Sequence, residues 1–368
     1  MRTASSTTET INPTTNKPTT AKGITMISFL KRSLPTVIFV IFISLLTAYV
    51  LLDAFVIERP ATDGPITLPP GLTTGKPITP MPPEDSNGAD TTADTDSGNT
   101  PDSDKEPDVT YPIIGDLYYK DENIEITITE HDLMNQNGID TAYFVVDLKL
   151  SDIEYLRTAF AKEQYGYKIR ETTTEIAERY NAIFAINGDY YGYRKDGFVL
   201  RNYTLWRDEP RSRKDGDDAL GILPDGSLFM FDENYMDSSN LLLADVYQVF
   251  SFGPRLIENG DILVDERSEV NQSAASNPRT GIGMVSPLHY KIVVSEGRLV
   301  NGDGLTLLEL AEIFDDLGCD TAYNLDGGSS TTLYFNGKVL NALPGDEREI
   351  SDIIFINGLT YSEDPRAQ

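Results

Sequence analysis

This chain of 368 residues carries 58 acidic against 30 basic side chains, a formal net charge of −28. So acidic a protein lacks the clustered Lys and Arg on which nucleic-acid binding depends, and any anionic substrate must be met by local cations. Its single cysteine excludes an intramolecular disulfide framework, and its two histidines exclude a multi-histidine zinc site. We assign no metal ligands and no cofactor.

The N-terminal part is not predicted to be a folded domain. Residues 1–22 are rich in Thr and Asn without an apolar period, and we predict a disordered cytoplasmic tail over 1–33. From Leu34 to Leu52 nearly every residue is apolar and none is charged, about the length that crosses a bilayer as a helix. We therefore predict a transmembrane helix over 34–57. A cleaved signal peptide is the alternative, because small residues lie near the end of the stretch.

The charges that flank this stretch predict its orientation. Basic residues precede it and acidic residues follow: Lys17, Lys22, Lys31 and Arg32 before, Asp53 and Glu58 after. By the positive-inside tendency the N-terminus is cytoplasmic and the rest of the chain extracellular, so we predict a single-pass protein of the cell membrane.

Residues 58–110 are dominated by Pro, Thr, Gly, Ser and Asp and contain very few large apolar side chains. Such a segment cannot bury enough surface to offset the entropy of ordering, so we predict a disordered linker. A glycosylated stalk is the alternative that this composition leaves open.

Residues 111–362 form the predicted globular domain. Ile124–Ile128 alternates at period two and predicts a half-buried strand, and Ala142–Leu148 predicts a more continuously apolar one. A capping box of Thr172 and Glu175 predicts a helix to about Asn181. A buried strand, 182–186, follows the helix and leads to Asn187-Gly188-Asp189.

The same order recurs near the C-terminus. Thr306 and Glu309 form a second capping box, an apolar helix face follows, and Gly318 is placed to end the helix. A short strand then leads to Asn324-Leu325-Asp326. Since both Asn-x-Asp segments follow a helix and a strand, we hypothesise that the two strand ends lie side by side in one pocket.

Between these units the chain is rich in hairpin signals. Turn residues flanked by apolar runs occur at 224–226, 258–261, 296–297 and 336–337. Hairpins with few helices predict an α+β fold, with a mixed, hairpin-rich β-sheet core and a few packed helices.

The stretch from Asn324 to Thr331 is a polar, glycine-rich corner between two predicted strands. Its paired glycines can adopt positive φ and approach a ligand closely, and consecutive amides there can form an anion-binding nest beside the Asp326 carboxylate. A tight turn whose side chains cap their own backbone is the alternative.

Three further blocks precede this corner: Asn187-Gly188-Asp189-Tyr190-Tyr191, Ser251-Phe252-Gly253-Pro254-Arg255-Leu256 and Asn277-Pro278-Arg279-Thr280-Gly281-Ile282-Gly283. In this order, the four blocks resemble the phosphodiester glycosidase family over roughly Ile183 to Gly358. The family pattern often has three glycines after the Asp, whereas Ser329 holds the third place here. Bacterial members of the family are often labelled exopolysaccharide proteins.

The resemblance implies hydrolysis of the bond that joins a sugar to a phosphodiester. This reaction passes through an oxocarbenium-like state, and the acidic phosphate leaves with little protonation, so cations and amides around the phosphate matter more than a strong acid. We expect the catalytic residues to be Asp326 and Asp189, near the anomeric carbon, and Arg279, whose planar guanidinium would hold the phosphate. The expected substrate-binding residues are Asn187, Asn324, Gly327, Gly328, Ser329, Arg255 and Tyr190.

We therefore predict a membrane-anchored extracellular hydrolase that acts on a cell-surface glycan or its sugar-phosphate precursor. A non-catalytic carbohydrate-binding protein on the same scaffold is the first alternative. A protein of envelope assembly that works by contact with partner proteins is the second, and an exposed apolar patch with an uncharged pocket would favour it.

Overall fold

A computed structural model describes residues 37–53, 57–61, 64–65, 112–134, 140–211, 218–268, 276–298 and 302–358. The chain divides into two compact units, Met1–Ile57 and Glu58–Gln368. In the first unit, residues 37–53 are helical. Among the described residues, no helix is both long and apolar enough to cross a membrane. The transmembrane helix expected over 34–57 falls partly outside these residues and stays a prediction. The tail predicted over 1–33 lies outside the described residues.

The second unit begins within the predicted linker. Arg59–Pro60 forms β1, a short strand that pairs antiparallel with β7, Gly166–Tyr167. The start of the predicted disordered linker is therefore structured, because the edge of β7 offers it backbone hydrogen-bonding groups. Residues 62–63 and 66–110 of this linker lie outside the described ranges.

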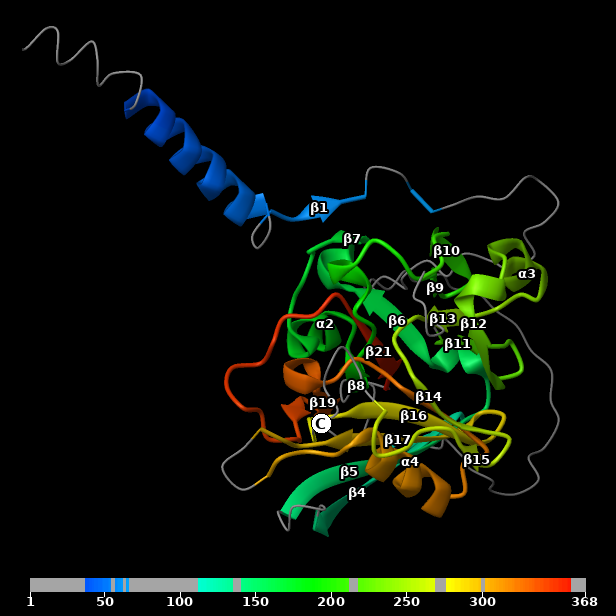
Figure 1. Ribbon diagram of the computed structural model, residues 1–368. Coiled ribbons are helices and arrows are strands. Elements are labelled where there is room, and N and C mark those ends of the chain that lie inside the picture. The colour runs from blue at the N-terminus through cyan, green and yellow to red at the C-terminus, as the bar shows by residue number, and fades with distance from the viewer. Residues whose placement is uncertain are drawn as a thin grey trace, which may run out of the picture. The chain divides into compact units, whose positions relative to one another are not determined.

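The largest sheet has nine described strands, and one of its faces is covered by helix α4, Leu307–Asp316 (Figure 1). Close packing of α4 needs glycines on the sheet, since a Cβ at Gly281 or Gly283 would lie 2.7 Å from the Phe314 ring. In spatial order the strands are β15 (Asp261–Ile262), β14 (Arg255–Glu258), β18 (Thr321–Asn324), β16 (Thr280–Ser286), β17 (His289–Ser295), β5 (Asp140–Leu150), β4 (Ile124–Met134), β3 (Tyr118–Lys120) and β2 (Ile113–Ile114).

A second sheet places the first Asn-x-Asp segment. Its central strand β8, Ala182–Asn187, is buried along its whole length, as its continuous apolar run predicts, and helix α2, Thr173–Arg179, packs on one face. Around β8 the strands follow the order β20 (Lys338–Val339), β19 (Leu333–Phe335), β8, β21 (Asp352–Asn357) and β6 (Arg157–Phe160).

A third sheet carries helix α3, Ser238–Leu243, near its apolar face. Its strands follow the order β10 (Thr204–Arg207), β9 (Val199–Arg201), β13 (Gln248–Phe250), β11 (Asp218–Ile222) and β12 (Leu228–Asp232). Short 3-10 turns complete the described fold: η1 (Ile153–Tyr155), η2 (Ala161–Glu163), η3 (Tyr191–Tyr193), η4 (Glu233–Tyr235) and η5 (Gly328–Ser330).

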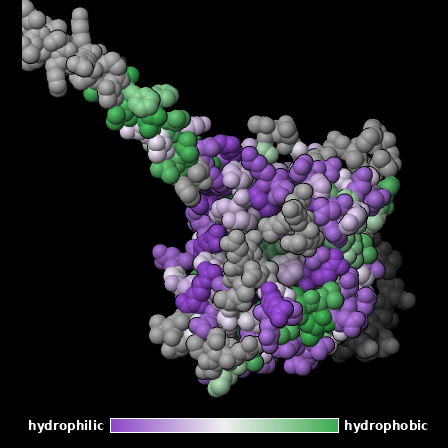
Figure 2. Space-filling model, in the orientation of Figure 1, coloured by the Kyte–Doolittle hydropathy of each residue, from purple (hydrophilic) through white to green (hydrophobic). Residues whose placement is uncertain are grey.

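The main core lies where the three sheets meet, and it includes Ile126, Phe184, Leu220 and Ile354. The α+β class is confirmed, but the core is not a mixed sheet, since every pair among the described strands is antiparallel. The face of the domain seen in Figure 2 is mostly hydrophilic, with a smaller apolar area at the lower right.

The local predictions can be checked against these elements. Both capping boxes are present, with Thr172 and Glu175 at α2 and Thr306 and Glu309 at α4. Three of the predicted turns join paired strands: β11 to β12, β14 to β15 and β19 to β20. The turn predicted at 296–297 does not, because β17 ends at Ser295 and the chain then passes toward α4.

Candidate active site

The two Asn-x-Asp segments touch at the ends of β8 and β18. The side-chain Nδ2 of Asn187 donates to the backbone carbonyl of Asp326 at 2.6 Å. Its Oδ1 accepts from Thr280 Oγ1 at 2.8 Å and from the Thr332 amide at 3.3 Å. Since Asn187 is only 1 % exposed, its observed role is to fasten strand ends from two sheets together. Its predicted contact with a sugar hydroxyl stays a prediction.

Asp326 is the carboxylate at the glycine-rich corner. It is 8 % exposed, and its Oδ1 accepts the Gly327 amide at 2.9 Å. Burial raises the pKa of Asp326 to about 6, and the nearby charge of Asp189 acts in the same direction. The Ser330 hydroxyl and the Arg348 guanidinium oppose this rise only in part. A carboxyl group with a pKa near neutrality can exchange protons during a reaction.

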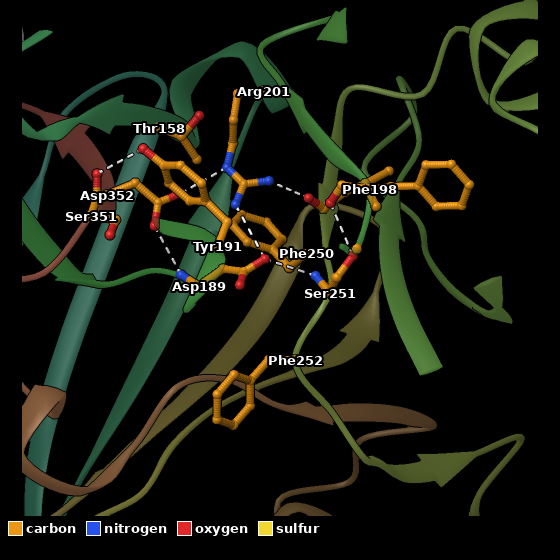
Figure 3. Close-up of polar contacts among 12 residues, drawn as sticks. Thr158, Asp189, Tyr191, Phe198, Arg201, Phe250, Ser251, Phe252, Ser351 and Asp352 are labelled. Carbon is orange, nitrogen blue, oxygen red and sulfur yellow. Dashed lines mark hydrogen bonds and ion pairs between the residues drawn. The ribbon is translucent and has the colours of Figure 1, made fainter. Parts of the chain in front are cut away.

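Asp189 lies in a different electrostatic setting. Arg194 Nη2 donates to its Oδ1 at 2.7 Å. The Ser251 amide donates to its Oδ2 at 2.8 Å, as Figure 3 shows. Burial acts to raise the pKa of Asp189, but Arg194 and Arg201 outweigh it, so this pKa lies below its ordinary value. Asp189 is therefore a fixed negative charge rather than a proton carrier at neutral pH.

Arg201 links Asp189 to a second buried carboxylate, Asp352 on β21. In Figure 3 the Arg201 guanidinium lies between the two acids, with its Nε 2.8 Å from Asp352 Oδ2 and its Nη2 3.5 Å from Asp189 Oδ2. The Asp189 amide also donates to Asp352 Oδ1 at 3.0 Å. Burial raises the pKa of Asp352, and the charge of Asp189 adds to that rise.

This packing explains the glycine between Asn187 and Asp189. A Cβ at Gly188 would lie 2.5 Å from Asp352 Oδ1, a distance that real Cβ atoms do not show. Position 188 therefore requires glycine, because any side chain there would collide with the Asp352 carboxylate.

The glycine-rich corner, residues 324–331, is hydrogen-bonded to the segment that contains Pro278. The Gly328 amide donates to the Pro278 carbonyl at 2.8 Å, and Gly328 has φ +63°, which favours glycine. Since the Gly327 amide already bonds to Asp326, contact of either amide with a phosphate would require these hydrogen bonds to open. Ser329 instead contacts a cation, because its Oγ lies 3.3 Å from Arg298 Nη1.

The two arginines predicted to contact the substrate, Arg279 and Arg255, bind other groups of the protein in this structure. Arg279 is 4 % exposed, and its Nε donates to the Leu305 carbonyl at 3.0 Å. Burial lowers the pKa of Arg279 to about 10, and the charge of Arg298 contributes. Arg255 forms ion pairs of 2.6 Å with Asp218 and 3.0 Å with Glu258. Neither of these observations tests a contact with substrate, so both roles stay predictions.

Asn324 and Tyr190 complete the predicted set. Asn324 is fully buried; its Nδ2 donates to the Gly253 carbonyl at 2.8 Å, while its Oδ1 has no hydrogen-bond partner in the described structure. The ring of Tyr190 stacks on Tyr193 with centroids 4.8 Å apart. Arg348 lies beside this pair, with its guanidinium carbon 5.7 Å from the Tyr193 ring centroid.

The sequence reasoning missed Arg194, Arg201, Arg348 and Asp352. A usable signal existed for two of them: Arg201 ends the apolar run 198–200, and Asp352 begins the apolar run 353–356. A charge at the border of a buried strand must find a partner, so such positions mark buried ion pairs. In the described ranges, no three His, Cys, Asp or Glu side chains gather in a metal-binding arrangement.

The region that contains this site is similar to known proteins. The family model described as phosphodiester glycosidase matches residues 180–357, which span both Asn-x-Asp segments. A curated relative, the SPbeta prophage-derived uncharacterized protein YomE of Bacillus subtilis (strain 168), is 26 % identical over 198 residues. That match covers 52 % of this chain and only 30 % of the relative.

The fold is similar to that of a solved structure. The catalytic domain of zebrafish N-acetylglucosamine-1-phosphodiester alpha-N-acetylglucosaminidase, auto-inhibited by its pro-peptide, superposes with a TM-score of 0.52 at 20 % identity. That match covers 68 % of this chain and 89 % of the zebrafish domain. A hypothetical protein from Synechocystis matches with a TM-score of 0.46 at 15 % identity, over 64 % of this chain and 62 % of its own.

Proposed function

The chain contains a phosphodiester glycosidase family domain, and from this premise we propose that it hydrolyses the glycosidic bond of a sugar-1-phosphodiester. The observation that carries the proposal is the Asp326 carboxyl group, buried at the corner where two sheets are fastened together, with a pKa of about 6. A group with this pKa is partly ionised near neutral pH and can accept a proton.

In the proposed reaction, water attacks the anomeric carbon and the bond from that carbon to the phosphate oxygen breaks. The Asp326 carboxylate takes the proton of the attacking water, and the leaving phosphate keeps the electron pair of the broken bond. Little protonation of the leaving group is needed, because a phosphate oxygen is a weak base.

Asp189 would act through Asp326 rather than on the substrate. It is 3 % exposed and enclosed by Arg194, Arg201 and the Ser251 amide. Its fixed negative charge raises the pKa of Asp326 and so makes that carboxylate a stronger base. We therefore assign Asp189 a positioning and electrostatic role.

The phosphate would be met by arginines at the same corner. Arg348 lies close enough to lower the pKa of Asp326, and Arg298 contacts Ser329 on the glycine-rich loop. These two guanidinium groups supply the cations that an anionic substrate of so acidic a protein requires. Arg279 remains the candidate from the sequence, although it would have to act from a buried position.

The test is to incubate the purified chain with N-acetylglucosamine joined through C1 to a phosphodiester and to measure release of the reducing sugar. The hydrolase proposal expects release by the natural chain and none by Asp326→Asn, with ligand binding largely retained. Binding without release by the natural chain would favour the non-catalytic carbohydrate-binding alternative. The glycan that carries this linkage in the cell, and the cellular location, stay predictions from the sequence.

A further inference from the structure

A cationic cavity lies beside the candidate active site. It has a volume of about 250 Å³, and Arg194, the ion-pair partner of Asp189, forms part of its wall. Pockets for drug-sized ligands measure about 300–1,000 Å³, so this cavity suits a ligand of roughly monosaccharide size rather than a polymer.

The charge of the lining is opposite to that of the protein. Of nine described residues that line the cavity, four are cationic, Arg59, Arg194, Lys195 and Arg207, and none is acidic. Arg207 is held by neutral acceptors, since its Nε donates to the Gly197 carbonyl at 2.6 Å and its Nη1 to the Arg194 carbonyl at 2.8 Å. In a chain of net charge −28, such a gathering of cations marks a site for an anion.

Tyrosine side chains, Tyr165, Tyr167 and Tyr191, also line this cavity. Tyr165 stacks on the buried Tyr191 with centroids 5.4 Å apart and an interplanar angle of 19°. The Trp206 ring centroid is 5.5 Å from that of Tyr165. Tyrosine combines an apolar face with a polar edge, which suits contact with the ring of a sugar.

Part of the wall comes from the N-terminal segment, far from the family-matched region in sequence. In β1, Arg59 pairs with Tyr167 and Pro60 with Gly166. The Ala61 amide donates to the Tyr165 carbonyl at 3.1 Å, and Glu58 forms a 2.6 Å ion pair with Lys162.

Gly166 makes this contact possible. A Cβ at Gly166 would lie 2.5 Å from the Arg59 carbonyl oxygen and 2.8 Å from Pro60 Cα. The segment can therefore pair with β7 only because Gly166 has no side chain, and this pairing places Arg59 at the cavity.

We propose that this cavity binds a phosphate group carried on a sugar, and that Arg59 from the N-terminal segment completes the binding site. The cations would hold the phosphate through charge-assisted hydrogen bonds, and the partly exposed Tyr165 and Tyr167 of the lining would contact the sugar ring. Binding here does not depend on the proposed hydrolysis, so the two proposals can fail separately.

Trp206 provides the measurement, because it is the single tryptophan of the chain and packs against the cavity wall. Its fluorescence is recorded while the full chain is titrated with glucose 6-phosphate, inorganic phosphate or glucose. We expect a saturable change with both phosphates, tighter for the sugar phosphate, and none with glucose at the same concentrations. Equal affinity for the two phosphates would overturn the sugar contact, and no saturable change with either would overturn the site.

Two variants test the role of the N-terminal segment. Arg59→Gln removes one cation, and Gly166→Ala pushes the segment away while every cation stays in the chain. Each should weaken glucose 6-phosphate binding at least about fivefold, since a hydrogen bond to a charged group is lost. The matched controls are Arg267→Gln, remote from the cavity lining, and Gly345→Ala, where a Cβ meets nothing within 4 Å.

The thermal unfolding transition of each variant is measured first. Affinities are compared only among proteins whose transitions match that of the natural chain. Natural affinity in Arg59→Gln would show that the segment takes no part in binding and would overturn that part of the proposal. Tighter binding in both test variants would also overturn it, because the segment would then obstruct the cavity. A loss in Arg59→Gln with natural affinity in both controls supports it, even where Gly166→Ala fails to fold.

Discussion

Replacing Asp326 with asparagine should stabilise the protein above neutral pH while it abolishes hydrolysis. Burial disfavours the ionised form, so the folded protein binds the Asp326 proton more tightly than the unfolded chain does. The pKa rises from 3.8 to about 6, and each tenfold change in proton affinity corresponds to about 1.4 kcal/mol, so ionised Asp326 costs the fold about 3 kcal/mol.

The sign follows from this raised pKa. The favourable contribution of Asp326 is complete below the unfolded-state pKa and is lost as the pH rises through the folded-state value. Asparagine carries no charge at any pH, so it avoids the penalty. The difference in unfolding free energy, variant minus natural protein, should therefore increase by about 2 kcal/mol between about pH 4 and about pH 8.

Urea unfolding of both proteins at a series of pH values measures this difference. Asp320→Asn is the matched control, because it makes the same exchange at an exposed position just before β18. A difference that is flat with pH, or that decreases toward alkaline pH, would refute the reasoning that burial governs Asp326. The same samples are assayed for sugar release, and undiminished release would refute its role in proton transfer.

Three further outcomes follow from the same geometry. Gly188→Ala should lower the unfolding free energy by about 1–3 kcal/mol in urea, because its Cβ meets the Asp352 carboxylate at 2.5 Å; natural stability would contradict this packing. Arg201→Gln should cost about 3–5 kcal/mol at neutral pH, since it leaves two buried acids without their shared cation, and a loss that does not shrink in acid would contradict the ion pairs. Arg348→Gln should move the acidic limb of the rate profile to higher pH, because Arg348 lowers the pKa of Asp326; an unmoved or lower midpoint would exclude this coupling.

The local part of the fold could be predicted because its signals are short in sequence. Each capping box spans four residues, and each predicted hairpin turn that is present joins neighbouring strands. The turn at 296–297 fails because glycine permits a change of direction without specifying which element comes next.

The site could be predicted only in part, because its chemistry depends on distant partners. The Asn-x-Asp segments stand out since they end buried strands, yet Arg201 and Asp352 meet across 151 residues of chain. No periodic pattern in the sequence indicates that Arg201 and Asp352 form a pair. The apolar runs beside Arg201 and Asp352 show that each charge needs a partner, but not which one.

The two acids of the Asn-x-Asp segments show why sequence similarity alone could not assign their roles. Asp189 is surrounded by arginines, and its pKa falls; Asp326 is surrounded mainly by backbone and a hydroxyl, and its pKa rises to about 6. One carboxylate is therefore a permanent charge and the other a proton acceptor. Since Asp189 itself raises the pKa of Asp326, neutralising Asp189 should weaken the base that remains. The pair works as one electrostatic unit, and the arginines around Asp189 determine which member exchanges the proton.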